Sequence, residues 1–165
     1  MSEEEQKALA LNVLKQFRII YGAMRQHFRA VEARCAASGS QMWILQEVAA
    51  SAGIGVGEVA RRLSVHQSTA SQLVEKLVVR GLVERRKTDA DLRRVGLYST
   101  DAGRALLESL PGPASGVLPE ALAALPLPVL KTLEINLDAL LEHLDGAEDD
   151  FGDIPLAEMV KDEGR

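Results

Sequence analysis

The side chains best suited to a chemical role lie in one stretch, residues 67–94. Small hydroxyl and amide side chains are frequent in its first part, and arginine and lysine side chains in the remainder. Hydroxyl and amide groups donate and accept hydrogen bonds, so they can read base edges, whereas guanidinium and ammonium groups pair with phosphates. The chemistry available to this stretch is therefore recognition of double-stranded nucleic acid.

Residues 67–80 (QSTASQLVEKLVVR) predict an amphipathic helix, and Gly81 is suited to the left-handed residue that ends it. One face is apolar and consists of Ala70, Leu73, Val74, Leu77 and Val78. The other face is polar and consists of Gln67, Ser68, Ser71, Gln72, Glu75 and Lys76. Ser68, Ser71 and Gln72 are short enough to approach bases, while Lys76, Arg80 and Lys87 suit phosphates. Ordinary solvated helices also carry Ser and Gln, so this face alone is weak evidence.

The neighbouring segments place this helix in a larger motif. Val56–Leu63 predicts a short helix, and residues 64–66 predict a turn that joins this short helix to the helix at 67–80. Residues 82–87 and 95–99 are β-type runs on either side of a polar loop at 88–94. This order predicts a winged helix-turn-helix, with Arg93 and Arg94 near the tip of the wing. The alternative is a solvated hairpin whose arginines pair with Asp89 and Asp91.

The stretch VGEVARRLSVHQSTASQLVEKLVVRGLVERRKTDADLRRVGLYSTDAGRALL resembles the MarR-type winged-helix transcription factors. The most specific pieces are S-T-x-S-x-L-V-x-K-L at residues 68–77, R-G-L-V-E-R at 80–85, D-x-R-R at 91–94 and T-x-x-G at 100–103. Two departures are visible. Ser99 replaces the usual aliphatic residue, and a Pro-Gly-Pro break at residues 111–113 interrupts the following helix. The break bears on the geometry of the dimer and leaves the DNA-binding assignment intact.

The resemblance implies a regulator that binds double-stranded DNA as a homodimer at a pseudo-palindromic operator. We expect a repressor, although an activator remains open. By resemblance, Arg93 enters the minor groove and Asp89 or Asp91 supports the wing. The expected DNA-binding residues are Gln67, Ser68, Thr69, Ser71, Gln72, Lys76, Arg80, Arg86, Lys87, Arg93 and Arg94.

Composition agrees with one soluble domain. The chain has 165 residues, of which 47% are apolar, and this is sufficient for one substantial core. Only 4% are aromatic, which disfavours single-strand binding by stacking. No apolar run is long enough to span a bilayer and the N-terminus is acidic, so we expect a cytoplasmic protein with no membrane partner. One cysteine, Cys35, excludes an intramolecular disulfide and a cysteine zinc site, and we expect no metal or cofactor.

The formal net charge of −5 is unevenly distributed. Residues 61–94 contain nine Lys and Arg against four Asp and Glu, a net charge of +5, which leaves −10 for the remainder. A basic segment on an acidic body orients a protein toward a phosphate backbone and limits adhesion elsewhere. The acidic isoelectric point is therefore compatible with DNA binding.

The flanking segments predict helices that form either an intramolecular bundle or, as the resemblance implies, a dimer. Apolar residues recur at helical spacing from Lys7 to about Ala36, a second helix follows residues 38–40, and further helices are expected at 100–110, 115–125 and 128–144. The fold class is thus mainly α with a small β-wing. We expect a single domain at 1–145, with a winged-helix lobe at 38–104, dimerisation helices at 7–36 and 105–145, and a loosely ordered acidic tail at 146–165 that could dock on the body.

Control of DNA binding is the open part of the assignment. By resemblance, a small aromatic or anionic effector would occupy the crevice between the dimerisation helices and the lobe, near Tyr21, Arg25, His27 and Trp43. Oxidation of Cys35 beside Arg34 is the alternative switch.

A non-DNA dimerisation adaptor is an alternative function. The three histidines match no catalytic motif, so we expect no enzyme; His66 could contact a phosphate or simply be solvated.

Overall fold

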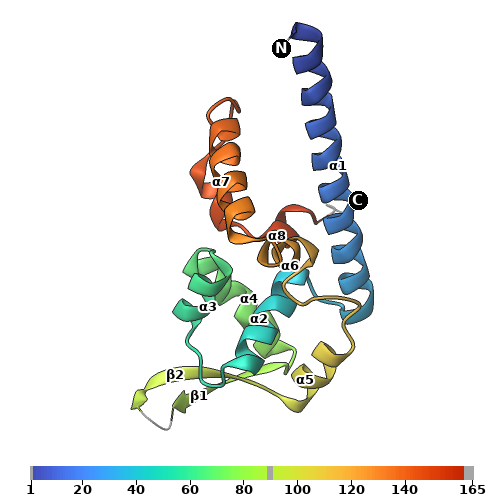
Figure 1. The fold of residues 1–165 in the computed structure, drawn as a ribbon. Coiled ribbons are helices and arrows are strands. Elements are labelled where there is room, and N and C mark those ends of the chain that lie inside the picture. The colour runs from blue at the N-terminus through green and yellow to red at the C-terminus, as the bar shows by residue number, and fades with distance from the viewer. Residues whose placement is uncertain (1, 89–90, 162–165) are drawn as a thin grey trace.

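A lobe of short helices and a hairpin lies at one end of a long helix in the computed structural model, which describes residues 2–88 and 91–161 (Figure 1). The mainly α fold class with a two-stranded wing is confirmed. In chain order the elements are α1 (Glu3–Cys35), α2 (Gly39–Ala50), α3 (Val56–Leu63), α4 (Gln67–Val79), β1 (Val83–Thr88), β2 (Asp91–Ser99), α5 (Asp101–Glu108), α6 (Val117–Ala123), α7 (Leu127–Leu141), the 3₁₀ helix η1 (Asp149–Asp153) and α8 (Leu156–Met159).

Helix α1 begins four residues earlier than the sequence predicts. The Ser2 hydroxyl accepts a hydrogen bond from the Glu5 backbone N–H, and the Glu5 carboxylate accepts one from the Ser2 N–H. This capping box satisfies amide groups that a helix N-terminus otherwise leaves unpaired, so the helix extends to Glu3. Only the C-terminal part of α1 joins the core, through Met24, Val31 and Cys35.

The predicted helix-turn-helix is confirmed. Helix α3 has the predicted bounds, and α4 ends one residue early, with Arg80 as its C-cap. The predicted apolar face of α4 packs against α2: its Ala, Leu and Val side chains are buried, except that Val78 is half-buried. Gly81 adopts the predicted left-handed conformation, with φ of 70°. The opposite face of α4 is thereby fixed on the outside of the lobe.

The wing is more regular than the sequence predicts. Residues 88 and 91–94 were expected in a loop, yet β1 extends to Thr88 and β2 begins at Asp91. The Thr88 hydroxyl donates to the Asp91 carbonyl and accepts from the Asp91 N–H, which prolongs the pairing past a bulge at Lys87 and Thr88. Polar side chains continue a strand here because both of its faces are exposed at this end.

The base of the wing is fixed to the loop that precedes α3. The Gly53 N–H donates to the Leu97 carbonyl at 2.8 Å, and the Leu97 N–H donates to the Ile54 carbonyl at 2.9 Å. A Cβ on Gly96 would lie 2.7 Å from the Gly53 Cα, so this close approach of two backbones requires glycine at position 96. The base of the wing is therefore joined directly to the start of the helix-turn-helix.

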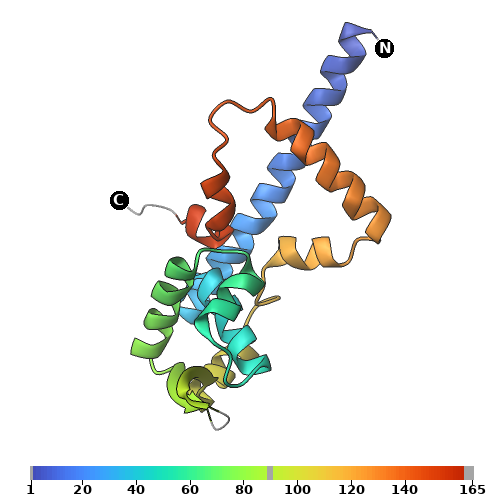
Figure 2. The same cartoon turned by 90° about the vertical axis from the view of Figure 1, so that its left-hand side faces the viewer.

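Beyond the wing, the described residues form helices α5, α6 and α7 and then the short helices η1 and α8. Thr100 caps α5 through the Gly103 N–H, and the Pro-Gly-Pro break ends that helix before α6. Helices α6 and α7 are shorter than predicted, at 117–123 and 127–141. Helix α7 faces the N-terminal half of α1 without running along it (Figures 1 and 2), and apolar side chains of α1, α6 and α7 line a groove of about 780 Å³. No described helix combines the length and apolar character that a membrane span needs.

The C-terminal tail differs from the expectation of loose order. Between residues 149 and 161 it forms η1 and α8, and α8 packs against α2. Ala157 is buried there, next to Gly39. A Cβ on Gly39 would lie 2.7 Å from the Phe28 ring and 3.3 Å from the Ala157 Cβ, so glycine at the start of α2 permits the close packing of α1 and the tail.

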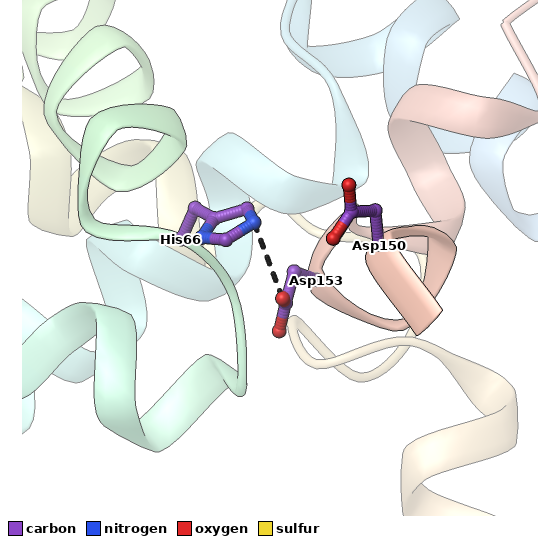
Figure 3. Close-up of side chains that lie close together, drawn as sticks. All are labelled: His66, Asp150 and Asp153. Carbon is purple, nitrogen blue, oxygen red and sulfur yellow. Dashed lines mark ion pairs between the residues drawn. The ribbon is translucent and has the colours of Figure 1, made fainter. Parts of the chain in front are cut away.

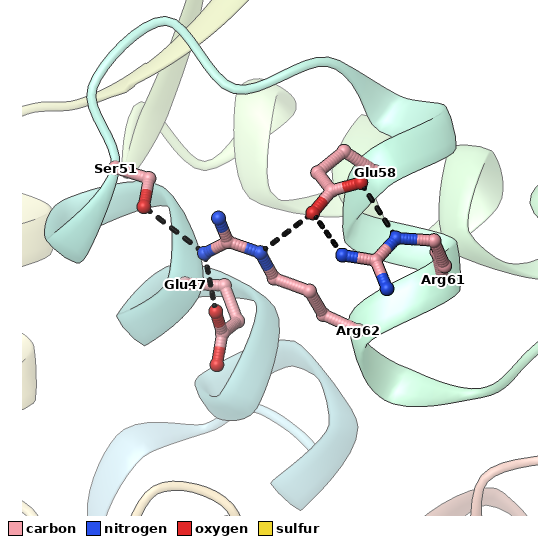
Figure 4. Close-up of polar contacts among 5 residues, drawn as sticks. All are labelled: Glu47, Ser51, Glu58, Arg61 and Arg62. Atoms are coloured by element: carbon pink, nitrogen blue, oxygen red, sulfur yellow. Dashed lines mark hydrogen bonds and ion pairs between the residues drawn. The ribbon is translucent and has the colours of Figure 1, made fainter.

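A polar network joins α2 to α3 on the outside of the lobe (Figure 4). The Arg62 guanidinium lies 3.0 Å from both the Glu47 and the Glu58 carboxylates and donates to the Ser51 hydroxyl. The Arg61 guanidinium pairs with Glu58 at 2.6 Å. Hydrogen bonds from Arg61, which has the larger effect, and from Arg62 lower the pKa of Glu58 from 4.5 to about 2.

This network predicts the acid behaviour of Glu58. Because its pKa is lower in the folded than in the unfolded chain, its contribution to stability is present above pH 4.5 and is lost as the pH falls through about 2. A carbon-detected NMR titration should give a midpoint near 2 for Glu58 in the wild type, and a midpoint nearer 4.5 in Arg61→Ala. A wild-type midpoint at the ordinary value would contradict the network.

Candidate nucleic-acid interface

The outer face of α4 displays most of the predicted reading residues. Gln67, Ser68 and Gln72 are exposed, whereas Thr69 and Ser71 are half-buried. The Gln67 amide lies beside Gly57 at the start of α3. Ser68 and Gln72 are four residues apart and therefore lie one above the other on the helix surface. The structure thus groups short polar side chains on the face that is turned away from the core.

The basic residues around α4 fall into two groups. Lys76 and Lys87 are exposed. The Arg85 guanidinium, by contrast, pairs with Glu75 at 2.6 Å, and Arg86 pairs with Glu84 while its guanidinium carbon lies 4.4 Å from the centre of the Tyr98 ring. Ion pairs this exposed are weak, so a phosphate can displace them. The first pair joins the wing to α4, whereas the second lies within the wing.

Arg80 is held more firmly than the sequence suggests. Its guanidinium donates to the Cys35 carbonyl at 2.9 Å and to the Ala36 carbonyl at 3.1 Å. These carbonyls belong to the last turn of α1, where the helix has no partners of its own for them and a cation is favoured. Arg80 therefore connects the C-terminal end of α4 to the C-terminal end of α1.

The tip of the wing carries Arg93 and Arg94 on β2, both exposed. The Asp91 carboxylate accepts a hydrogen bond from the Arg93 backbone N–H at 3.0 Å, which braces the start of the strand. Arg94 lines a cleft beneath the wing together with Glu58 and Tyr98. Successive residues of a strand point to opposite faces, so Arg93 and Arg94 cannot reach the same groove. Asp89 lies outside the described residues.

The four predicted effector residues have different surroundings. Tyr21 is half-exposed on α1, Arg25 lines a shallow cavity with Phe28 and α8, and His27 lies beside the Pro-Gly-Pro break. Burial lowers the pKa of His27, and a hydrogen bond with the Pro113 backbone partly opposes this. Trp43 lines a separate cavity. The structure therefore does not bring the four residues together.

The cavity at Trp43 has a volume of about 230 Å³ and lies between the lobe and α1. Its walls are mainly apolar and come from α1, α2, the helix-turn-helix turn, α6 and the C-terminal tail. The residues that line it include Met24, Phe28, Trp43, Val65, Leu118, Ile154 and Leu156. Because these residues are scattered along the chain, no local pattern in the sequence indicates the cavity.

The structure also brings the acidic tail to the start of α4, a contact that the sequence analysis missed (Figure 3). The His66 Nε2 atom lies 3.2 Å from an Asp153 carboxylate oxygen, and the His66 backbone N–H donates to the Asp153 carbonyl at 3.3 Å. The Asp150 carboxylate is close by, with one polar atom from each of the three residues within 4.8 Å of the others. The only sequence signal was the acidic composition of the tail.

The lobe matches a known family. Residues 38–94, from the cap of α2 to the wing, match the family model described as the MarR family. This segment belongs to the MarR family. The resemblance predicted from the sequence is confirmed for this segment, which we call the MarR lobe. Among curated proteins, none matches the chain.

Solved structures share the fold over most of the chain. A point mutant of S. aureus MepR bound to an oligodeoxyribonucleotide is 22% identical, with a TM-score of 0.51 over 81% of this chain and 98% of that one. A mutant of E. coli MarR complexed with operator DNA is 24% identical, with a TM-score of 0.51 over 79% and 96%. YusO from Bacillus subtilis is 18% identical, with a TM-score of 0.52 over 87% and 99%. At sequence identities of 18–24%, the structural similarity establishes that the fold is shared.

The contacts of Arg80 predict a loss of stability on substitution. Arg80→Ala removes two charge-assisted hydrogen bonds to the end of α1 and should lower the free energy of unfolding by about 1–2 kcal/mol. Urea denaturation measures this change. Lys76→Ala, one turn earlier on the same helix, is the matched control and should change stability by less than about 0.5 kcal/mol. Equal losses for the two variants would show that the contacts of Arg80 contribute nothing to stability.

Proposed function

We propose that the protein is a transcriptional regulator that binds a specific double-stranded DNA site as a homodimer, with repression as its mode of action. The observation that carries the proposal is the pairing, on one rigid lobe, of an exposed polar helix face with an arginine-bearing wing. Helix α4 has the dimensions of a recognition helix for the major groove, and the wing can reach the backbone or minor groove beside it. No catalytic role is part of the proposal.

The side chains divide into those that read bases and those that anchor the lobe. Ser68, Ser71 and Gln72 read base edges, because their hydroxyl and amide groups match the donor and acceptor pattern of the major groove. Gln67 and Thr69 assist at the first turn. The anchors on the phosphates are the basic side chains of α4 and β1, namely Lys76, Arg80, Arg86 and Lys87. Of these, Arg80 would have to exchange its contacts with α1 for a phosphate.

The wing contributes through the shape of the DNA. Arg93 enters a narrow A·T-rich minor groove, where the negative potential is concentrated and a guanidinium is favoured. Asp91 supports this by bracing the Arg93 backbone. Arg94, on the other face of the strand, stays near the cleft under the wing. The MepR and MarR structures described with bound DNA are consistent with this assignment of the lobe.

A second copy of the chain would cover the groove between α1 and α7. Large apolar side chains stay exposed on both helices, which is unusual for a monomer in water. They include Leu9, Leu11, Phe17, Ile19 and Ile20 on α1 and Leu127, Ile135, Leu137, Leu140 and Leu141 on α7. A two-fold dimer buries such surface and places two α4 helices on successive turns of DNA.

Release from DNA by a small effector is the proposed control. The cavity at Trp43 is the favoured site, since it is apolar and its walls join the lobe to α1, which an effector could push apart. The redox alternative gains no support, because Cys35 is buried at the end of α1 and oxidation requires access to the sulfur. An adaptor without DNA binding is disfavoured by the basic surface of the lobe.

DNA recognition can be tested with a duplex selected from a random library, by fluorescence anisotropy at two salt concentrations. Gln72→Ala should cost about 1–3 kcal/mol on the selected duplex and little on random duplex, because it removes a base contact. Lys76→Ala is the comparison: it should weaken both duplexes alike and reduce the salt slope by about 1. If the wild type binds no duplex even at low salt, the proposed function is wrong.

The dimer can be tested by sedimentation. The wild type should be a dimer at micromolar concentration, and Leu137→Glu should be a folded monomer, because it places a charge in the apolar groove. Leu92→Glu makes the same change on the exposed wing and should remain a dimer. A monomeric wild type would refute the proposed assembly.

A further inference from the structure

The C-terminal segment Asp149–Lys161, here called the strap, spans the boundary between the MarR lobe and α1 (Figures 2 and 3). One end contacts His66, the residue that precedes α4, and the other end packs on the first turn of α2. Between the two ends, Ile154, Pro155 and Leu156 form a wall of the cavity at Trp43. The strap is therefore in contact with the turn of the helix-turn-helix and with the start of α2.

The first end brings negative charge to the recognition helix. Two contacts with Asp153, one from the His66 ring and one from its backbone N–H, hold the strap to this point, and the Asp150 carboxylate lies beside them. The N-terminus of an α-helix carries a partial positive charge that favours anions. A DNA phosphate near the start of α4 would meet these two carboxylates.

The second end is anchored by packing. Ala157 is buried against Gly39, where a side chain on the glycine would clash with Phe28 and approach the Ala157 Cβ. Glu158 lies next to the cap of α2 and pairs with Lys161. Burial alone would raise the pKa of Glu158, but hydrogen bonds from Lys161 and Ser38 outweigh it and lower the pKa. The anionic form of Glu158 is thus suited to the start of α2.

Docking of the strap is nevertheless marginal. Within the described residues, the Ser40 hydroxyl and one oxygen of Glu158 are buried without a hydrogen-bond partner, which costs free energy. The ion pair at His66 is about half exposed, so it contributes little. Segments with few buried contacts open at low cost, and the strap has one buried residue, Ala157. The docked state can therefore be displaced by a competing ligand.

We propose that the docked strap is an autoinhibitory contact, which competes with the phosphate backbone of DNA for the start of α4. The proposal rests on the DNA-binding function proposed above. In the docked state Asp150 and Asp153 repel phosphate, and undocking removes them while opening one wall of the cavity at Trp43. Because coupling between two binding events is reciprocal, DNA must also loosen the strap.

The only tryptophan of the chain, Trp43, reports directly on docking. It lines the same cavity as Ile154 and Leu156, so release of the strap should expose its ring to solvent. Quenching of Trp43 fluorescence by acrylamide, a neutral quencher, measures that exposure independently of DNA binding.

Ala157→Glu is the decisive variant, because its side chain cannot fit against Gly39 and must undock the strap. It should increase acrylamide quenching of Trp43 and tighten binding to the selected duplex by about tenfold, within the usual range of coupling. The added negative charge would by itself weaken binding, so tightening cannot come from net charge. Ala147→Glu adds the same charge in the exposed segment before the strap and is the matched control. It should leave the quenching of Trp43 unchanged and should not tighten DNA binding.

A second variant, Asp150→Asn with Asp153→Asn, tests the charges themselves and should also tighten binding. Addition of duplex to the wild type should increase acrylamide quenching of Trp43. The proposal is overturned if Ala157→Glu leaves quenching unchanged, if it exposes Trp43 without tightening DNA binding, or if saturating duplex leaves the wild-type quenching unchanged. Failure of the wild type and of every strap variant to bind duplex would instead reject the DNA-binding function.

Discussion

Burial of most of α2 is the constraint on which the rest of the structure depends. Met42, Ile44, Leu45 and Val48 are fully buried, and α2 has no continuous polar face, which is the pattern of a helix enclosed by others. Helices α3, α4, α5 and α8 and strand β2 all pack around it. Since α4 turns its apolar face inward to cover α2, its polar face can only point outward. Packing of one apolar helix thus exposes the candidate DNA-reading surface.

Folding of the tail brings acidic side chains next to the basic lobe. The chain separates a basic lobe from an acidic remainder by sequence, yet the strap returns acidic side chains to His66 at the start of α4. A flexible acidic tail would repel DNA only weakly, because at physiological ionic strength charges further apart than about 8 Å are largely screened from each other. A docked strap instead holds Asp150 and Asp153 beside His66, at the start of α4. Docking, more than net charge, determines whether the tail influences the lobe.

The sequence was sufficient where local rules decide the structure. The bounds of α3 and the inner face of α4 follow from helical periodicity, and the left-handed Gly81 from its position after a helix. It was insufficient where distant segments meet. Docking of the strap depends on the space above Gly39, which no periodicity encodes. The expectation that Arg25 and His27 line one effector crevice also conflicts with helix geometry, because residues two apart on a helix point to nearly opposite sides.

Helix α4 is held at both ends by parts of the chain outside the MarR lobe. Its N-terminal end contacts the strap through His66, and its C-terminal end contacts α1 through Arg80. The two contacts differ in strength: Arg80 donates two hydrogen bonds to otherwise unsatisfied carbonyls, whereas the His66 pair is exposed to solvent. A shift of the lobe relative to α1 would therefore strain the contacts of Arg80, whereas release of the strap would break the contact at His66. The polar residues proposed to read DNA lie near the His66 end, so release of the strap acts on them more directly than the contact at Arg80 does.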